Sequence, residues 1–412
     1  MFFFRVCIMA LRSLWIHPLR SILATLGVII GVAAVVAAMA ILEGMGARMA
    51  TGFESMGSNK LFVMPEVERR GRRAVGNFDS LELEDAEAIE RSCQRTIQRV
   101  MPQIMNSVTV KFLSKTTNAT ILGATDVYPI INSHNVSEGE FFTRANVQGK
   151  ANIVVLGAKV KQELFGGIPA IEEKIKISGM STLGTRTFTV VGVMEEKGNV
   201  GFTDVDRQII IPITTAMDKV YGVEFIQTIV AEARSAEDAD IEEAKNEIKK
   251  LLRQRHKIRA GQQDDFQVQA QKEFVAQFGQ FQKIIGVVLG SIAGISLVVG
   301  GIGIMNIMLV AVTERTREIG VRMAMGAQRM DVMKQFLVEA SFVSFLGGAM
   351  GVLMGWGLAN TIERLTRVFE TLTSAWSIVA ALAMATGTGI VSGIYPAWKA
   401  SRLDPVEALR YE

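Results

Sequence analysis

Residues 21–42 read SILATLGVIIGVAAVVAAMAIL and contain no charged side chain. At ~1.5 Å of rise per residue, a helix of this length crosses a hydrocarbon core of ~30 Å. Three further apolar runs follow at roughly 284–312, 336–359 and 375–397. These runs explain why the 412-residue chain is 49% hydrophobic and only 21% charged. The sequence therefore predicts an α-helical membrane protein with four transmembrane helices.

The N-terminal residues allow more than one interpretation. Basic residues before the first run resemble the start of a secretory signal peptide, and Ala38-Met39-Ala40 resembles a cleavage site. We favour a retained span, because the apolar run is long and three more spans follow. Residues 1–20 are expected to form an amphipathic helix on the cytoplasmic membrane surface. The alternative is a continuation of the first span that bends at Pro18.

Arginine and lysine near the span ends predict the orientation of the chain. They precede the first span, follow the fourth, and cluster between the second and third. Both termini are therefore expected in the cytoplasm of a multi-pass inner-membrane protein. The predicted segments are the cytoplasmic surface helix (1–20), spans at 21–43, 284–312, 336–360 and 375–397, an extracytoplasmic domain with a stalk (44–283), a cytoplasmic coupling region (313–335), a short external loop (361–374) and a cytoplasmic tail (398–412).

The segment 44–283 differs in composition, because charged residues occur throughout it and apolar runs shorten to strand length. Alternating strands and helices predict a large α/β extracytoplasmic domain, with two subdomains as an option. Asp79 and Glu82 fit a capping box for a helix at 80–92. Further helices are predicted at 236–255 and 272–283, and strands at 60–65, 107–113, 118–124, 152–157, 174–178, 187–194, 207–213 and 225–233.

The chain carries no pattern that predicts catalysis, a metal site or a bound cofactor. Its three histidines lack the spacing of zinc ligands, and neither a G-x-S-x-G elbow nor a phosphate-binding G-x-x-x-x-G-K-[ST] loop occurs. Glu195-Glu196 and the pair Asp204/Asp206 are interpreted as solvated loop charges. A net charge of +3 without a long basic block argues against nucleic acid as a partner. ATP-Mg, if used, is expected in a partner chain.

Glycines recur at four-residue spacing within the predicted spans. Such spacing lets helix backbones approach closely in lipid, where no hydrophobic force draws helices together. Packing within one bundle is the favoured interpretation, and a dimer face is the alternative. The candidate residues are Gly286, Gly290 and Gly294 in the second span, Gly347, Gly351 and Gly355 in the third, and Gly389 and Gly393 in the fourth.

The loop between the second and third spans contains ERTREIGVRMAMGA at 314–327. We predict a short amphipathic helix at the membrane face, with Ile319 and Met323 on its apolar edge. Its mixed charges can dock into a soluble ATPase or anchor the loop at lipid headgroups. Glu339, about one turn into the third run, is interpreted as a boundary residue, with a buried functional carboxylate as the alternative. The candidate ATPase-coupling residues are Glu314, Arg315, Thr316, Arg317, Glu318, Ile319, Gly320 and Arg322.

Three stretches, at 10–35, 311–340 and 393–412, together resemble the permease part of MacB-type ABC transporters, within the FtsX-like superfamily. They read ALRSLWIHPLRSILATLGVIIGVAAV, AVTERTREIGVRMAMGAQRMDVMKQFLVEA and GIYPAWKASRLDPVEALRYE. The resemblance covers nearly the whole chain. It implies a homodimer, an outer domain of two subdomains, and docking of the 314–327 helix on an ABC ATPase. It also implies mechanotransmission, in which ATP hydrolysis moves the outer domain.

The function implied by this resemblance is export of an antibiotic, a peptide or another small molecule, with a periplasmic adaptor and an outer-membrane channel as further partners. Lipoprotein release is one alternative, and FtsX-like control of an envelope hydrolase is another. The size of the outer domain favours the first two. Because Met1 directly precedes the surface helix, the ATPase is expected in a separate chain, whereas MacB-type proteins carry it fused ahead of the permease.

Overall fold

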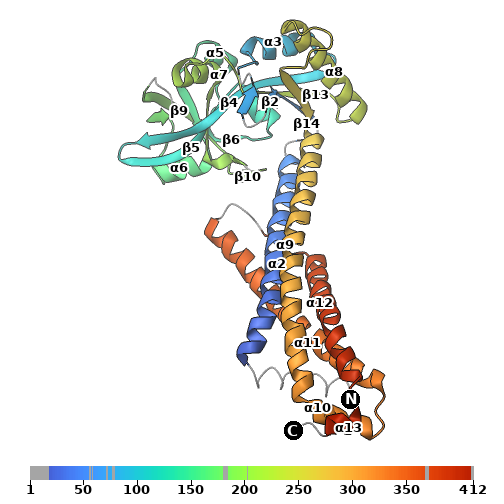
Figure 1. The fold of residues 1–412 in the computed structure, drawn as a ribbon. Helices are drawn as coiled ribbons and strands as arrows, with labels where there is room; N and C mark the ends of the chain where they lie inside the picture. The colour runs from blue at the N-terminus through green and yellow to red at the C-terminus, as the bar shows by residue number, and fades with distance from the viewer. Residues whose placement is uncertain are drawn as a thin grey trace. The chain divides into compact units, whose positions relative to one another are not determined.

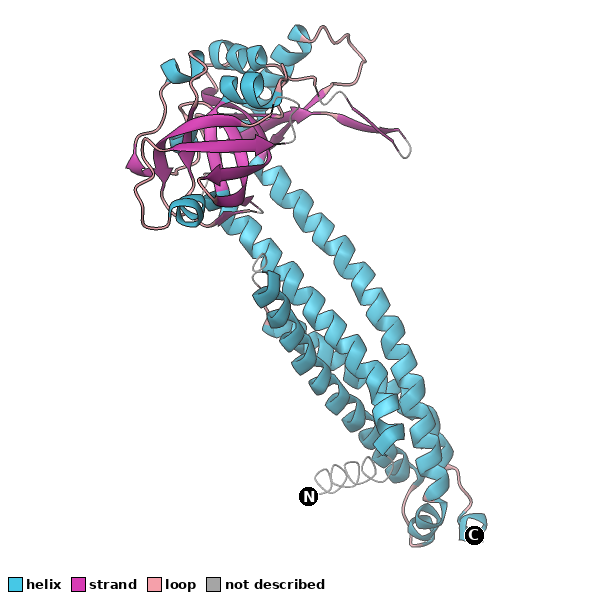
Figure 2. Ribbon diagram, turned by 90° about the vertical axis from the view of Figure 1, so that its left-hand side faces the viewer, coloured by secondary structure: helices cyan, strands magenta, loops and turns pink. Residues whose placement is uncertain are grey.

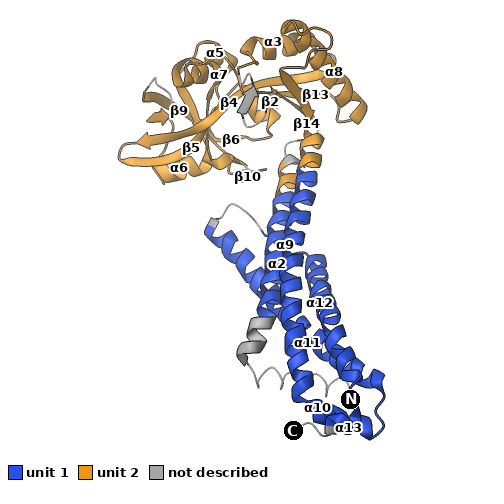
Figure 3. Ribbon diagram, in the orientation of Figure 1, with its two compact units in different colours: residues 1–47, 278–412 blue, residues 48–277 orange. Residues whose placement is uncertain are grey.

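The part of the chain that this computed structural model describes contains four long apolar helices and one α/β domain (Figure 1). The structure describes residues 18–54, 57, 59–70, 73–76, 79–179, 184–201, 203–366 and 371–409. The predicted surface helix at 1–20 therefore lies almost entirely outside the described residues. The chain divides into unit 1, residues 1–47 with 278–412, and unit 2, residues 48–277 (Figure 3).

Each long helix has the length and apolar content needed to cross a membrane. The first precedes the α/β domain and the other three follow it, which confirms the predicted fold class. The predicted helix at 272–283 and the second span are one continuous helix. The helices are α2 (Pro18–Glu54), α9 (Gln271–Glu314), α11 (Arg329–Thr366) and α12 (Ala375–Ser401), with the short α10 (Thr316–Ala324) and α13 (Pro405–Leu409) between and after them.

Glycines of α11 and α12 lie where neighbouring helices of unit 1 come closest. A Cβ atom built on Gly355 would lie 2.6 Å from the carbonyl oxygen of Ala33 on α2. A Cβ atom on Gly393 of α12 would lie 2.7 Å from the Cβ of Ala340 on α11. Both separations are shorter than van der Waals contact, so these positions admit only glycine without a shift of the helices.

Gly286, Gly290 and Gly294 on α9 are in a different situation. A Cβ atom built on any of them meets no other described heavy atom within 4 Å. Large apolar neighbours on the same helix, such as Val287 and Ile295, are also exposed. This stripe therefore contributes nothing to packing inside the described part of one chain.

One sheet of unit 2, whose strands are magenta in Figure 2, combines a helix-covered part with a strand ring. The long strand β4 (Ile97–Phe112), labelled in Figure 1, belongs to both parts. Its first half pairs with β13 in the order β14–β1–β13–β4. The helix α8 packs on β13 and β14, and α3 packs on β4. The elements of this part are β1 (Lys60–Pro65), α3 (Leu83–Ser92), β13 (Thr228–Ala233), α8 (Asp238–Arg255) and β14 (Phe266–Ala270).

The second half of β4 belongs to a closed ring of strands. The pairings run from β4 to β5, β12, β7, β9 and β8, and from β8 back to β4. The ring and its attachments are β5 (Lys115–Ala124), α4 (Tyr128–Ile131), β6 (Val136–Gly139), α5 (Arg144–Gln148), β7 (Ile153–Leu156), α6 (Ala158–Phe165), β8 (Lys174–Gly179), β9 (Arg186–Met194), η1 (Val205–Arg207), β12 (Gln208–Pro212), α7 (Ile213–Thr215) and η2 (Ala216–Tyr221). Two small hairpins join β2 (Val67–Arg70) with β3 (Arg73–Gly76), and β10 (Asn199–Val200) with β11 (Thr203–Asp204).

The capping box predicted for the first helix of this domain is wrong by one turn. The N-cap residue of α3 is Glu82, and Asp85 accepts a hydrogen bond from the Glu82 backbone N–H at 2.9 Å. Glu82 is therefore the first half of the box instead of the second. Asp85 was not singled out in the sequence, because a buried aspartate gives no periodic signal.

Candidate functional site: the coupling surface of unit 1

The chain turns sharply on both sides of α10. Arg315 has φ −103° and ψ 17°, outside the helical region, and separates α9 from α10. The hydroxyl of Thr316 donates to the carbonyl oxygens of Val312 and Thr313 at 3.0 and 2.9 Å. At the other end Gly326 has φ +100°, a conformation that favours glycine. The two turns make α10 a separate short helix.

One side of α10 is buried against its own chain. Ile319 is buried, and Met323 packs against the same apolar cluster, as the predicted apolar edge requires. Gly320 faces α13, where a Cβ atom built on it would lie 2.7 Å from the Cβ of Ala408. Thr316 is buried as well. Three of the candidate coupling residues therefore hold α10 in place and do not face outward.

Two arginines connect α10 with α11. The Arg315 guanidinium donates to both carboxylate oxygens of Glu339, at 3.2 and 3.3 Å. Arg322 donates to Gln335 at 2.8 Å and also pairs with Glu318. Glu339 is only 2% exposed, so its carboxylate is buried within the chain, and its position at the membrane boundary stays a prediction. A buried charge without a partner is costly, and the pair with Arg315 offsets that cost.

The outward side of α10 combines charged and apolar side chains. Glu314, Arg317 and Glu318 are exposed. Val321 and Met325 are 41% and 80% exposed and follow Arg317 at helical spacing. Val406 on α13, next to α10, is also exposed. An exposed apolar patch with charged side chains around it is typical of a surface that binds a protein or a membrane.

The sequence interpretation missed Val321, Met325 and Val406. It named Ile319 and Met323 as one apolar edge and did not single out the apolar residues on the other side of the helix. The available signal was the spacing of Val321 and Met325 from Arg317, which places all three on the side away from Ile319. We name the exposed residues Glu314, Arg317, Glu318, Val321, Met325 and Val406 the coupling surface.

The described acidic residues elsewhere are not grouped around a metal position. Within the described ranges, no group of three or more His, Cys, Asp or Glu side chains is placed to hold a metal ion. The interpretation of Asp204 and Asp206 as solvated charges is wrong. Asp206 is fully buried and accepts the backbone N–H groups of Lys197 and Gly198 at 2.8 and 2.9 Å. Asp204 pairs with Lys159 at 3.0 Å.

Both units of the chain match known protein families. Residues 21–251 match the MacB-like periplasmic core domain, and residues 290–405 match the FtsX-like permease C-terminal region. The chain belongs to the MacB-like permease family. The coupling surface of this MacB-like chain, except Val406, lies within the FtsX-like match, whereas unit 2 holds most of the periplasmic core match.

Several relatives align along almost the full length of this MacB-like chain. The macrolide export ATP-binding/permease protein MacB of Bdellovibrio bacteriovorus is 37% identical over 97% of this chain and 61% of its own length. The pyoverdine export ATP-binding/permease protein PvdT of Pseudomonas syringae pv. syringae is 35% identical over 98% and 59%. The chain thus spans about 60% of the curated relatives that it matches. The periplasmic region of MacB from Actinobacillus actinomycetemcomitans aligns with TM-score 0.45 at 19% identity, covering 55% of this chain and 95% of that one.

Proposed function

We propose that this chain is the membrane (permease) subunit of an ABC exporter and that a separate ATPase subunit, which binds ATP-Mg, docks on the coupling surface. One observation carries the proposal. The helix α10 is fixed to α11 and α13 on its inner side, and its outer side presents charged and apolar groups together. A helix held this way transmits force instead of yielding to it.

The path of the force follows from chain connectivity. The helix α9 runs for 44 residues from Gln271 to Glu314 and ends immediately before α10. At ~1.5 Å per residue this single helix extends over roughly 65 Å. Its first residues, 271–277, belong to unit 2. A displacement of α10 therefore acts on α9 directly and on α11 through the pair Arg315–Glu339, and we propose that it moves unit 2.

The proposed assembly is a homodimer in the inner membrane with both chain termini in the cytoplasm. The open stripe Gly286, Gly290 and Gly294 supports a dimer contact along α9, because glycines at this spacing let two helices approach closely. The relatives' names include macrolide and pyoverdine export, and we propose a small-molecule substrate for this chain too. A periplasmic adaptor and an outer-membrane channel complete the proposed pump.

Charge reversal on the coupling surface tests the docking role. The chain is reconstituted in lipid nanodiscs with the ABC ATPase that co-purifies with it, and ATP hydrolysis is measured against ATPase concentration. Arg317→Glu is expected to weaken the apparent affinity about tenfold, as loss of a charged contact of roughly 1.4 kcal/mol would. Met325→Asp should act in the same direction, because it places a charge among apolar contacts.

The matched control is Lys334→Glu, which reverses an exposed charge on α11 outside the coupling surface. This variant is expected to behave as the unmodified chain does, and the chain without ATPase should hydrolyse no ATP. Undiminished stimulation in both Arg317→Glu and Met325→Asp would refute docking at α10. An equal loss in Lys334→Glu would show that general charge at the membrane face matters, as the lipid-anchoring interpretation holds.

A further inference from the structure

Unit 2 contains a cavity of about 420 Å³ where β4 passes from the helix-covered part of the sheet into the strand ring. This volume falls in the range of roughly 300–1,000 Å³ that small-molecule sites occupy. Apolar side chains from several elements form one end of the cavity. Phe62 of β1 and Phe274 of α9 meet edge to face with ring centroids 5.4 Å apart, and Met49 and Met105 lie beside the same space. Methionines adapt their shape to a flexible apolar ligand.

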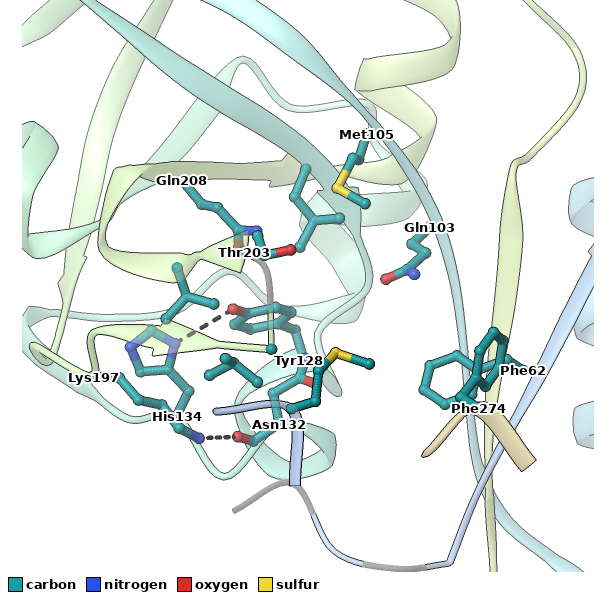
Figure 4. A pocket seen from close by; sticks show the side chains of 15 residues that line it. Phe62, Gln103, Met105, Tyr128, Asn132, His134, Lys197, Thr203, Gln208 and Phe274 are labelled. Carbon is teal, nitrogen blue, oxygen red and sulfur yellow. Dashed lines mark hydrogen bonds between the residues drawn. The ribbon is translucent and has the colours of Figure 1, made fainter. Parts of the chain in front are cut away.

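The opposite end of the cavity is polar. Figure 4 shows His134, Asn132 and Lys197 together on the side away from Phe62 and Phe274. The Lys197 ammonium donates to the backbone oxygens of Asn132 and Ser133 at 2.6 and 3.0 Å. An ammonium group has three donors, so one hydrogen-bond donor of Lys197 remains for another acceptor.

Lys197 is the only formally charged side chain among the described residues that line the cavity. Burial lowers the pKa of His134, so its ring is neutral at pH 7. The ring nitrogens already contact the Glu195 carbonyl oxygen at 2.8 Å and the Tyr128 hydroxyl at 3.4 Å. A second lysine, Lys60, is fully buried next to Asn132 at the polar end of the cavity.

The Lys60 ammonium reaches the Asn132 side-chain oxygen at 3.5 Å. Two of the nearby carboxylates, Glu232 and Asp206, are engaged elsewhere, and the third, Glu195, is exposed. Glu232 pairs with Arg99 at 2.8 Å. Asp206 accepts two backbone N–H groups and lies 3.5 Å from the Lys159 ammonium. The polar end of the cavity therefore carries a positive potential that no lining carboxylate cancels.

Backbone hydrogen bonds hold Lys197 at this wall. The buried Asp206 carboxylate fixes the N–H groups of Lys197 and Gly198, and Asp206 itself lies in the short turn η1 that leads into β12. The hairpin β10–β11 follows Lys197 and supplies Val200 and Thr203 to the cavity. A built wall of this kind holds the ammonium in place before any ligand enters, which lowers the cost of binding.

We propose that this cavity binds a long-chain monocarboxylate, with its hydrocarbon chain between Phe62, Phe274 and the two methionines and its carboxylate at Lys197. Apolar burial supplies most of the affinity, at about 0.8 kcal/mol for each methylene group. The ammonium selects the anion. The inference does not depend on the transport function, because the cavity lies wholly within unit 2 and its test requires no ATPase.

The test uses the full chain in lipid nanodiscs and a dodecanoic acid that carries a photoactivatable diazirine on its chain. After illumination, labelled peptides are mapped by mass spectrometry. Labelling of the apolar helices, which the lipid-dissolved probe also reaches, serves as the internal reference. We expect specific labelling of the cavity peptides that contain Phe62, Met105, Tyr128 or Val205. Dodecanoate should remove this labelling at a concentration about tenfold lower than dodecanol or dodecyltrimethylammonium requires.

Two variants separate the charge from the cavity. Lys197→Glu is expected to reduce cavity labelling about tenfold, whereas Lys115→Glu, an exposed charge reversal on the same domain, should leave it unchanged. Met105→Trp fills the cavity from a position that is 40% exposed, so the fold tolerates the larger ring. This variant should also lose labelling while its thermal unfolding stays unchanged.

Unchanged cavity labelling in Lys197→Glu would overturn the assignment of the carboxylate to Lys197. Competition by dodecanol that equals competition by dodecanoate would overturn the preference for an anion. Absence of specific cavity labelling in the unmodified chain would overturn the site itself. None of these outcomes bears on ATPase docking, so the failure of this inference and the failure of the proposed function are distinguishable.

Discussion

Unit 1 and unit 2 are held together by different means. In unit 1 the helices approach one another closely at glycines, where no side chain holds their backbones apart. In unit 2 large buried side chains such as Phe165 and Phe188 fill the space between strands and helices, and ion pairs join the elements at the edges. The difference teaches that adding atoms should damage unit 1, whereas removing atoms or charges should damage unit 2.

The same contrast occurs inside unit 1, between two stripes with identical spacing. On α11, Gly351 and Gly355 lie against the backbone of α2, with built Cβ atoms 2.8 and 2.6 Å from carbonyl oxygens. On α9, Gly286 and Gly290 face no described atom within 4 Å. Glycine spacing therefore marks a surface where a helix can approach, and it does not say whether the partner belongs to the same chain.

The largest loss of stability is expected from adding side chains at Gly351 and Gly355 on α11. Gly351→Leu combined with Gly355→Leu drives side-chain atoms into the α2 backbone, which cannot move aside as a flexible side chain does. Overpacking at two such positions should cost more than about 3 kcal/mol and prevent formation of the native bundle. Size-exclusion chromatography and thermal unfolding of the purified chain measure the loss.

The matched control for this pair is Gly357→Leu on the same helix, where a built Cβ atom meets nothing within 4 Å. The control should elute and unfold as the unmodified chain does. A native elution profile and unchanged unfolding temperature in the double variant would contradict the packing of α11 on α2.

A smaller loss of stability is expected in unit 2 when the pH rises. His256 donates to Asp265 at 2.8 Å and to Asp85 at 3.2 Å, and its hydrogen bond with Asp85 raises the pKa of the ring from 6.5 to about 9. A histidine whose pKa is higher in the folded chain than in the unfolded chain stabilises the fold. This contribution is complete below the pKa of the unfolded chain and is lost as pH rises through the pKa of the folded chain. Between pH 7 and 9.5 the free energy of unfolding should fall by about 2 kcal/mol from this residue.

Urea unfolding of the full chain, followed by circular dichroism at both pH values, measures this change. Burial lowers the pKa of Lys60 to about 8, so this lysine changes the stability in the opposite direction over the same range. The contribution of His256 is therefore the difference between the unmodified chain and His256→Gln in the change from pH 7 to 9.5, and His134→Gln should change as the unmodified chain does. An identical change in His256→Gln and in the unmodified chain would contradict the role of His256. Unit 1 variants such as Gly357→Leu should leave the pH dependence unchanged.

The fold was predictable where a sequence pattern has one physical cause. Apolar length alone predicts the four spans, and β-branched runs predict β1, β5, β7, β8, β9, β12 and β13 to within a few residues. The sequence analysis missed β14, FQVQA at 266–270, because glutamines occupy its two half-buried positions. It also missed the first half of β4, since Pro102 and polar residues interrupt the apolar pattern there. Ring closure depends on pairings between distant strands, which no local pattern encodes.

The candidate site was predictable as a segment but not as a surface. Residues 316–324 form a short helix within the segment 314–327 that the sequence predicts, yet Thr316, Ile319 and Gly320 face inward. The partner of Arg315 could not be predicted, because Glu339 lies 24 residues further along the chain in an apolar helix. Likewise, the cavity in unit 2 is assembled from residues between Met49 and Phe274, so its charge pattern exists only in the folded domain.

The smallest effect on stability is expected from filling the open stripe. Gly286→Leu combined with Gly290→Leu adds side chains where no described atom lies within 4 Å, and leucine favours a helix over glycine by up to about 1 kcal/mol for each residue. The unfolding temperature of the chain should therefore stay the same or rise slightly. If the stripe is the proposed dimer contact, the same substitutions keep two α9 helices apart and lower dimer formation.

Disulfide cross-linking through Val287→Cys, in a chain whose own cysteines at positions 7 and 93 are replaced by serine, reports the dimer in membranes. Val287 is 71% exposed on α9, so the new thiol is accessible to a partner. Cross-linking should be strong with the glycines present and should fall severalfold with the leucines. Equal cross-linking in both backgrounds would place the dimer contact elsewhere. A loss of stability as large as that of the Gly351 and Gly355 variant would show that the α9 stripe packs within its own chain, and the contrast between the two stripes would disappear.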